Sequence, residues 1–307
     1  MITVVGSLNM DLFIEIAQLP SPGETVLGRN FRSAPGGKGA NQAVAVARMG
    51  GACMLIGAVG DDPFGAAILA NLREAGIDST NVARRIGVSC GVAMIALDKN
   101  GQNQIVVAGG ANETLTPDDV ARHAEVFARS KAVVVQLEIP LAAVEAALRL
   151  GRQAGALTVL NPAPCLPLSD ELLSLCDWIV PNELEAAQLS GLKVRDRADA
   201  AKAAKKVRKR SGGSNILVTL AADGVWLETD AFAGHVPGFK VQAVDTVGAG
   251  DTFIGAFVTR LVEGAAAHEA ARFGCAAAAL AVTRRGAQAG IPFRTEVEAW
   301  LPGAGGS

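Results

Sequence analysis

The stretch Ala243–Phe253, AVDTVGAGDTF, carries the most informative local pattern in the chain. Hydrophobic residues lead into the small turn residues Gly248, Ala249 and Gly250, and a helical pattern follows at once. We therefore expect a strand, a tight turn and a helix, which is a unit of α/β folds. The N–H groups of such a turn and of the helix N-terminus can bind anionic oxygen.

Outward from this stretch, strand-like runs alternate with helical stretches along the whole chain of 307 residues. This alternation predicts βαβ units around a mostly parallel sheet. The fold class is therefore α/β, a doubly wound and mostly parallel sheet flanked by helices, within a single domain of residues 1–307. The expected strands are ITVVG (2–6), KAVVVQLE (131–138), ALTVLNP (156–162), WIVP (178–181) and NILVTL (215–220).

Two regions interrupt the alternation, at about residues 12–34 and 81–108. Both read as short strands joined by Pro-Gly and Asn-Gly turns, the latter at Asn100-Gly101. We expect a small β-sheet beside the main one, acting as a lid that excludes water. The alternative is an antiparallel extension of the sheet edge that does not move.

Composition and charge narrow the possible partners. The chain has 28 basic and 30 acidic residues, a net charge of -2 and a pI near 6.0, so it lacks the basic surface of a nucleic-acid binder. The basic stretch 198–210 has alanines at helical spacing and predicts an amphipathic helix with a solvated basic face. The N-terminus lacks a basic leader region, and no apolar run approaches membrane-spanning length. We expect a cytoplasmic enzyme with small soluble substrates, no membrane association and a frayed GAGGS tail.

Cysteine and histidine residues offer no metal or disulfide pattern. The five cysteines are scattered without Cys-x-x-Cys spacing, and an odd number cannot all pair. The three histidines lie far apart in the sequence. We expect reduced cysteines and no zinc site.

Asp251 follows the glycine turn directly. A carboxylate beside an oxyanion pocket can accept a proton from an attacking hydroxyl while the pocket stabilises charge on a transferring phosphoryl group. The alternative is that Asp251 only caps the helix, and an isolated Gly-x-Gly-Asp pattern favours the cap.

A second glycine cluster, Pro35–Gln42 (PGGKGANQ), also precedes a helical stretch. Adjacent glycines allow a close approach to a ligand, and the amide of Asn41 can both donate to and accept from sugar hydroxyls. Near the N-terminus, Asn9 and Asp11 are two residues apart and should share one face of a strand. They could cap a turn or bind a vicinal diol.

Four motifs occur in a characteristic order: GSLNMD (6–11), GGKGANQA (36–43), NELE (182–185) and DTVGAGDTF (245–253). Together they resemble the ribokinase family of sugar kinases, whose signature regions are the double-glycine segment and the Gly-Ala-Gly-Asp segment. The resemblance runs from end to end of the chain.

The resemblance implies a sugar site, with Asp251 as general base and an anion hole made by Gly248, Ala249 and Gly250. The residues that it assigns to the sugar are Asn9, Asp11, Gly37, Lys38, Gly39, Asn41, Glu138 and Asp251.

The resemblance also implies ATP and Mg²⁺. Asn182 and Glu185 would organise magnesium, phosphate and water, although Asn182 could also cap the helix that follows it. Cys275 lies where relatives often have Asn or His beside the adenine, which bears on nucleotide selectivity. The residues implied at the nucleotide are Asn182, Glu185, Thr219, Ala221, Gly224, Gly250 and Cys275.

A monovalent cation, K⁺, is a further implication. Main-chain carbonyls would enclose it beside the anion hole, and Gly290 replaces a Ser that often helps to complete the site. We expect potassium activation that persists but requires more of the ion than in relatives with the Ser; the alternative is that a water fills the vacancy and the affinity is unaffected. The residues implied are Asp245, Val247, Ala281, Arg284, Gly286 and Gly290.

The function implied by the resemblance is transfer of the γ-phosphoryl group of ATP to O5 of ribose, giving ribose 5-phosphate and ADP. A homodimer formed through the β lid is expected. One alternative is a kinase for deoxyribose, fructose or adenosine. The other is a sugar-binding regulator without catalysis, against which the intact Asp251 and its glycine turn argue.

Overall fold

The computed structural model describes residues 1–98 and 103–301. Two expectations fall outside these residues: the Asn100-Gly101 turn and the frayed GAGGS tail.

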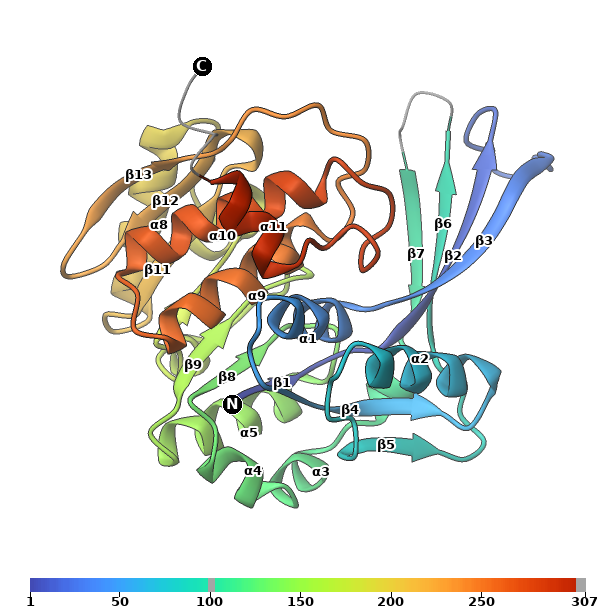
Figure 1. The fold of residues 1–307 in the computed structure, drawn as a ribbon, viewed down its shortest axis with the longest axis horizontal. Coiled ribbons are helices and arrows are strands. Elements are labelled where there is room, and N and C mark those ends of the chain that lie inside the picture. The colour runs from blue at the N-terminus through green and yellow to red at the C-terminus, as the bar shows by residue number, and fades with distance from the viewer. Residues whose placement is uncertain (99–102, 302–307) are drawn as a thin grey trace.

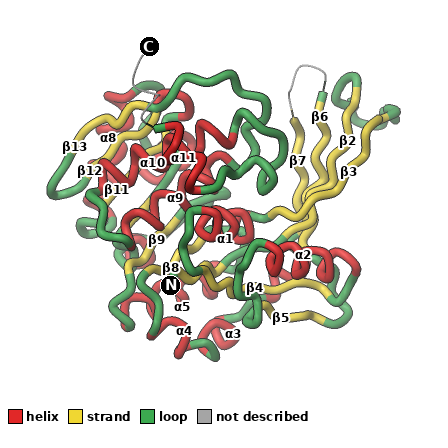
Figure 2. Tube along the Cα trace, viewed as in Figure 1, coloured by secondary structure: helices red, strands yellow, loops and turns green. Residues whose placement is uncertain are grey.

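A nine-stranded sheet forms the centre of the molecule (Figures 1 and 2). Its order is β13-β12-β11-β10-β9-β8-β1-β4-β5. The strands from β11 to β5 are parallel, and β12 and β13 add antiparallel pairs at one edge. The bounds are β1 Ile2–Val5, β4 Cys53–Gly60, β5 Val82–Arg85, β8 Ala132–Val135, β9 Leu157–Leu160, β10 Trp178–Ile179, β11 Asn215–Thr219, β12 Gly224–Glu228 and β13 Ala233–Pro237.

The central strands are buried because both of their faces are apolar and covered. Successive residues of a strand point to opposite faces, so Val4 packs in one hydrophobic cluster and Val5 in another, both fully buried. All five runs expected to be strands are strands of this sheet, which confirms the mostly parallel α/β class.

Helices cover the two faces of the sheet. Those on the Val4 side are α1 Lys38–Arg48, α2 Pro63–Glu74, α9 Ala249–Val262, α10 Ala267–Ala281 and α11 Arg294–Trp300. Those on the Val5 side are α3 Pro117–Ala121, α4 Ala124–Ala128, α5 Leu141–Gln153, α6 Asp170–Leu173, α7 Glu183–Ser190 and α8 Arg197–Arg210. Two 3₁₀ turns, η1 Gly110–Thr114 and η2 Ala221–Asp223, complete the elements.

The basic stretch forms α8 as expected. Its small apolar residues, Ala200, Ala203, Ala204 and Val207, are fully buried, while the lysines face outward. This burial explains the helix as an amphipathic packing element.

A second sheet of four strands, in the order β3-β2-β6-β7, projects from the body (Figure 1). Its bounds are β2 Asn9–Ile16, β3 Gly28–Gly36, β6 Gly91–Leu97 and β7 Asn103–Ala108. The outer pairs are antiparallel, and β2 and β6 are parallel. This is the small sheet expected from the two interruptions, although β5 within the second interruption pairs with β4 of the main sheet.

The expected strand before the glycine turn is wrong. Residues 238–248, all within the described chain, form an irregular connection from β13 to α9. The N–H groups of Val244 and Asp245 both donate to the Val282 carbonyl, at 2.7 and 3.1 Å, rather than to a neighbouring strand. Val244 is 57% exposed, so its β-branched side chain does not pack against a sheet, although such residues are common in strands.

Between residues 1–98 and 103–301, no helix is both long and apolar enough to cross a membrane.

Candidate active site

A pocket of about 240 Å³ opens where several parallel strands end. Asn161 follows β9, Asn182 follows β10, and Thr219 is the last residue of β11; all three line the pocket. Ligands of open α/β sheets bind at these carboxyl ends, because the loops there converge on one edge. Lys38 from α1, Glu185 from α7 and the 248–251 turn complete the lining.

The first turn of α9 faces this pocket. The Ala249 N–H donates to the Thr246 carbonyl at 3.3 Å, whereas the N–H groups of Gly250 and Asp251 have no acceptor among the described residues. Gly248 is the N-cap of α9, with a φ of 78°, and the helix begins without a side-chain cap among the described residues. A Cβ on Gly248 would lie 2.9 Å from backbone atoms of Ala287, so glycine suits both the dihedral and the packing. A helix N-terminus of this kind stabilises anionic oxygen.

Asp251 lies in this first turn, and its side chain is held from two sides. Asn41 Nδ2 donates to Oδ2 at 3.0 Å, and Gln42 Nε2 donates to Oδ1 at 2.9 Å. Burial raises the pKa of Asp251, while Lys38 and the two amide donors oppose the rise. Asp251 does not cap its own helix through its side chain, because both of its carboxylate oxygens accept from the side-chain amides of Asn41 and Gln42 on α1.

Lys38 stands among carboxylates at the start of α1. Burial by itself would lower the pKa of Lys38, but Asp251, Glu138 and Glu185 outweigh it and raise the pKa. The ammonium group is therefore held in its charged form at the pocket, where it can bind a phosphate.

Glu138 caps α1 from a loop after β8. One of its oxygens accepts from Ser7 Oγ at 2.5 Å and from the Lys38 N–H at 3.1 Å. The Gly39 N–H donates to Ser7 Oγ at 3.3 Å. The N-terminus of α1 is thus satisfied by protein groups, unlike that of α9.

Asn9 and Asp11 lie on β2 and are 3% and 6% exposed. Burial raises the pKa of Asp11 to about 7; Glu138 and Asp251 add to this, and Arg32 opposes it. The Asp11 carboxylate lies over Gly36, where a Cβ would come within 2.1 Å of its Oδ2. A side chain at position 36 would therefore displace Asp11.

Asn112 orients Asn9. Its Nδ2 donates to Asn9 Oδ1 at 2.7 Å and to the Leu8 carbonyl at 3.1 Å, and its Oδ1 accepts from the Leu8 N–H at 2.9 Å. Since Asn9 Oδ1 is occupied, the amide NH₂ of Asn9 remains as the donor for a ligand.

Asn182 and Glu185 form a capping box at the start of α7. Asn182 Oδ1 accepts from the Glu185 N–H, and the Glu185 carboxylate accepts from the Asn182 backbone N–H, each at 2.9 Å. Asn182 also bridges to Thr219, so the two residues are neighbours. The cap interpretation of Asn182 is confirmed, and it keeps Glu185 at the pocket wall.

The remaining nucleotide residues lie outside the pocket lining. Ala221 begins η2 and Gly224 follows it, and both have positive φ, 48° and 96°. Cys275 lies buried on α10, and burial raises its pKa to about 12.

The segments expected to hold a monovalent cation lie side by side. The Asp245 carboxylate accepts from the N–H groups of Val247 at 3.0 Å and Gly286 at 2.9 Å. A Cβ at Gly290 would lie 2.8 Å from the Gly286 carbonyl oxygen and 3.1 Å from that of Ala281. Main-chain oxygens therefore converge here, as hard cations require.

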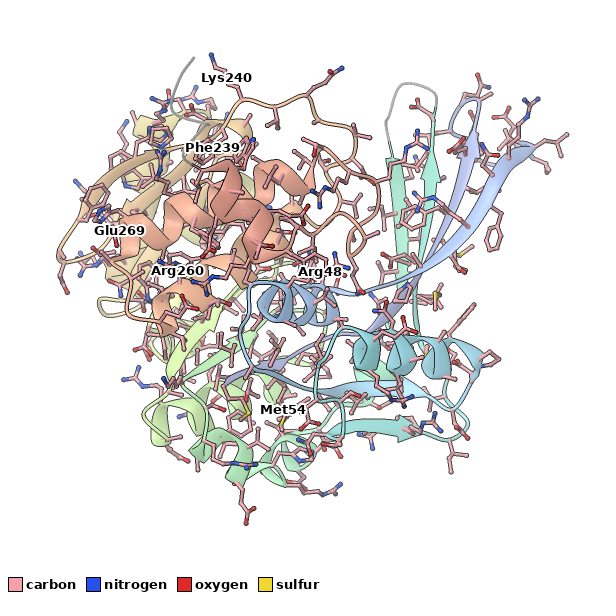
Figure 3. All side chains as sticks on the ribbon, viewed as in Figure 1. Arg48, Met54, Phe239, Lys240, Arg260 and Glu269 are labelled. Carbon is pink, nitrogen blue, oxygen red and sulfur yellow. The ribbon has the colours of Figure 1, made fainter. Side chains whose placement is uncertain are left out.

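The same loop is anchored to α1. Arg48, labelled in Figure 3, donates from Nη1 to the carbonyls of Gln288 at 2.7 Å and Ile291 at 2.6 Å. Gln288 Nε2 in turn donates to Asn41 Oδ1 at 3.0 Å. The loop is thereby linked to the amide that holds Asp251.

Sequence reasoning missed Gln42, Asn112, Asn161 and Gln288. Gln42 directly follows Asn41 in the quoted glycine cluster, so its position was a usable signal. Asn112 and Gln288 contact the site only through tertiary folding. In the part of the chain that the structure describes, no cluster of three or more His, Cys, Asp or Glu residues could hold a metal ion.

Comparisons with known proteins agree over nearly the whole chain. Residues 1–294 match the pfkB family of carbohydrate kinases. A ribokinase of Haemophilus influenzae is 44% identical, covering 98% of each chain, and a deoxyribokinase of Salmonella typhi is 39% identical, again covering 98% of each. The structure of an Arabidopsis thaliana ribokinase complexed with ribose and ATP has a TM-score of 0.88 at 32% identity and covers 98% of each chain.

The chain has a mostly parallel sheet, a pocket lined by a helix N-terminus and a buried carboxylate, and a smaller projecting sheet. Together with the family match, these features identify an enzyme of the phosphotransferase class, with an alcohol group as acceptor. The chain belongs to the pfkB family of carbohydrate kinases, and its type within that family is that of the ribokinases.

Proposed function

We propose that the protein phosphorylates D-ribose at O5 with ATP, giving ribose 5-phosphate and ADP. The observation that carries this proposal is the position of the buried Asp251 carboxylate in the first turn of α9, beside open N–H groups and Lys38. The Arabidopsis relative bound to ribose and ATP supports both substrates.

Asp251 serves as the general base. The O5 proton passes to its carboxylate as the bond from O5 to the γ-phosphorus forms, and the bond from that phosphorus to the β,γ-bridging oxygen breaks. The N–H groups of the 248–251 turn and the charge of Lys38 stabilise the transferring phosphoryl group. The raised pKa of Asp251 makes it a stronger base than an exposed aspartate.

Asn9 and Asp11 bind the sugar hydroxyls, with Gly37, Lys38, Gly39, Asn41 and Glu138 around them. Asn9 offers a donor, because Asn112 occupies its oxygen, and Asp11 offers an acceptor. The close fit of Gly36 beneath Asp11 keeps this carboxylate in place.

The nucleotide lies along Asn182, Glu185, Thr219, Ala221, Gly224 and Gly250, with Cys275 near the adenine. Asn182 and Glu185 suit a hydrated Mg²⁺, which binds through few protein ligands and supplies charge neutralisation between phosphates. Their capping box holds both side chains in place for that role.

Potassium would bind the main-chain carbonyls of Asp245, Val247, Ala281, Arg284 and Gly286. The bound ion would hold the loop beneath Gly248 in one conformation. The convergence of the Ala281 and Gly286 oxygens fits such an ion. Gly248 packs on Ala287 of this loop, so loop order fixes the N–H groups of the turn.

The deoxyribokinase relative supports a second candidate substrate, 2-deoxyribose. Loss of one hydroxyl leaves a buried polar group unpaired, which costs about 1–3 kcal/mol, or roughly 5- to 150-fold in kcat/KM. We expect ribose to be preferred by that ratio. ADP release with ribose, 2-deoxyribose, fructose and adenosine tests this, and equal kcat/KM for the two pentoses would assign a broader pentose kinase.

Asp251→Asn is the test of the base. It should lower kcat by about 10²–10⁴-fold while ribose still binds. A variant that keeps more than about a tenth of the wild-type kcat would exclude Asp251 as the base. A sugar-binding regulator would show no ADP release in the wild type either.

The small sheet is the proposed dimer interface, and the enzyme is proposed to act in the cytoplasm. Apolar side chains are exposed on the small sheet: Phe31 is 68%, Met94 62% and Val106 66% exposed. Exposed apolar patches of this kind mark interaction surfaces. Light scattering of the wild type and of Met94→Lys should show a dimer and a monomer respectively.

A further inference from the structure

A chain of buried amides reaches Asp251 from the centre of the sheet. Gln136, just after β8, donates from Nε2 to Gln42 Oε1 at 2.6 Å, and Gln42 donates from Nε2 to Asp251 Oδ1 at 2.9 Å. Both glutamines are fully buried. Neither lines the pocket, so Gln42 acts on a ligand through the two pocket residues that it holds, Asp251 and Asn161.

The orientation of the Gln42 amide is determined at both ends. Its Nε2 donates to Asn161 Oδ1 at 3.1 Å as well as to Asp251, and Asn161 Nδ2 donates to the Val180 carbonyl at 3.1 Å. If the Gln42 amide were reversed, its oxygen would face two acceptor oxygens. Its NH₂ group is thus directed at Asp251.

The orientation of the Gln136 amide leaves its own oxygen, Oε1, without a hydrogen-bond partner among the described residues. Of the residues that the structure describes, Gln136 Oε1 is one of two buried side-chain polar atoms without a hydrogen-bond partner. It lies against Gly6, where a Cβ would come within 2.1 Å of it. Reversing the Gln136 amide would set two oxygens against each other at Gln42, so the unpartnered oxygen follows from the donation to Gln42. Native proteins rarely leave buried polar groups unpaired, and a catalytic role is one reason for such an exception.

We propose that Gln42 is a positioning residue for Asp251, which sets the orientation and proton affinity of that carboxylate without touching substrate. This inference rests on the proposed role of Asp251 as general base. Asn41 holds the other oxygen, Oδ2, at 3.0 Å. Two fixed donors together define the plane of the carboxylate, and preorganisation of this kind lowers the barrier.

Besides its two amide donors, Asp251 has four charged or ionisable neighbours, which come from four different segments. Lys38 on α1 favours its ionised form, whereas Glu138 after β8, Glu185 on α7 and Asp11 on β2 disfavour it. A change at Gln42 leaves all four in place. The effect of Gln42 can therefore be separated from theirs.

The test is a series at position 42 in which the acid limb of log kcat against pH is measured. Gln42→Glu replaces the donor by a carboxyl group that must share a proton with Asp251, so the acid-limb pKa should rise by about one unit or more. Gln42→Met removes the donor without adding an acid, so the limb should rise by less, and kcat at its plateau should fall by about 10- to 100-fold through misplacement. Gln153→Glu, exposed on α5, is the matched control and should keep the wild-type profile.

The order of acid-limb pKa values, wild type below Met and Met below Glu, supports the proposal. A lower Tm with kcat and acid limb unchanged in both variants would overturn it and assign Gln42 to packing alone. If Gln42→Glu does not fold, the acid-limb pKa and the plateau kcat of Gln42→Met decide between the two outcomes. Asp251→Asn measured in parallel separates the two hypotheses: turnover in that variant refutes the base, whereas an inactive Asp251→Asn with wild-type kinetics at position 42 refutes only the positioning role.

Discussion

Asp11 makes folding and sugar binding depend on pH in opposite directions. Its carboxyl group is buried on β2, and burial, with Glu138 and Asp251 nearby, raises its pKa from 3.8 to about 7. Because the folded-state pKa lies above the unfolded one, the folded state holds this proton more tightly. The resulting stability is fully present below about pH 3.8 and is lost as the pH rises through about 7.

The rise of about 3 units, at about 1.36 kcal/mol per unit, makes ionisation of Asp11 cost about 4 kcal/mol. Asp11→Asn keeps the shape and removes the charge. We expect the variant to be more stable than the wild type by up to about 4 kcal/mol at about pH 8.5, but by only about 1.6 kcal/mol at about pH 5, where the unfolded state is already ionised and the folded state is still protonated. Urea unfolding at both pH values measures this difference, with the exposed Asp61→Asn as control.

Ribose should show the opposite trend, because the ionised carboxylate is the better acceptor. The ionised fraction of Asp11 rises about tenfold between about pH 6 and pH 8, so the ribose Kd of the wild type should fall about tenfold. In Asp11→Asn the Kd should be weaker by about 1.5–3 kcal/mol and independent of pH, with little change for ATP. Identical pH dependences of unfolding in wild type and variant would refute the reasoning.

Further expectations concern the turn and its loop. Gly248→Ala should lose about 1–2 kcal/mol of stability because of the positive φ, and most of its kcat because the new Cβ meets Ala287. The control Gly264→Ala, with a φ of 93° and open space around its Cβ, should lose stability only. Equal kcat values for the two variants would refute the role of the turn. Potassium should activate at fixed ionic strength more than sodium or choline; equal rates in all three would exclude the cation site. Gly290→Ser must shift the loop, since its Cβ meets the Gly286 carbonyl; if the serine hydroxyl still completes the site, half-saturation should need less potassium, and an unchanged value would refute that role.

Local sequence patterns were enough to predict the fold class and part of the candidate site. Alternating apolar runs predicted the parallel strands, because strands buried on both faces must be continuously apolar. The helix cap at Asn182 and the glycine turn at Gly248 could be predicted from the sequence, since both depend only on residues that are neighbours in the chain. The expected strand before Gly248 was wrong, because β-branched residues there serve an exposed connection.

By itself, the sequence thus determined the elements, their alternation and the turn that carries Asp251, since these follow from periodicity and local backbone chemistry. Only the tertiary structure decided which amides hold that carboxylate and how strongly Asp11 retains its proton. Gln136 and Gln42 are 94 residues apart, and Asn112 and Asn9 are 103 apart. Such contacts, and the burial that shifts a pKa, exist only once distant segments pack together.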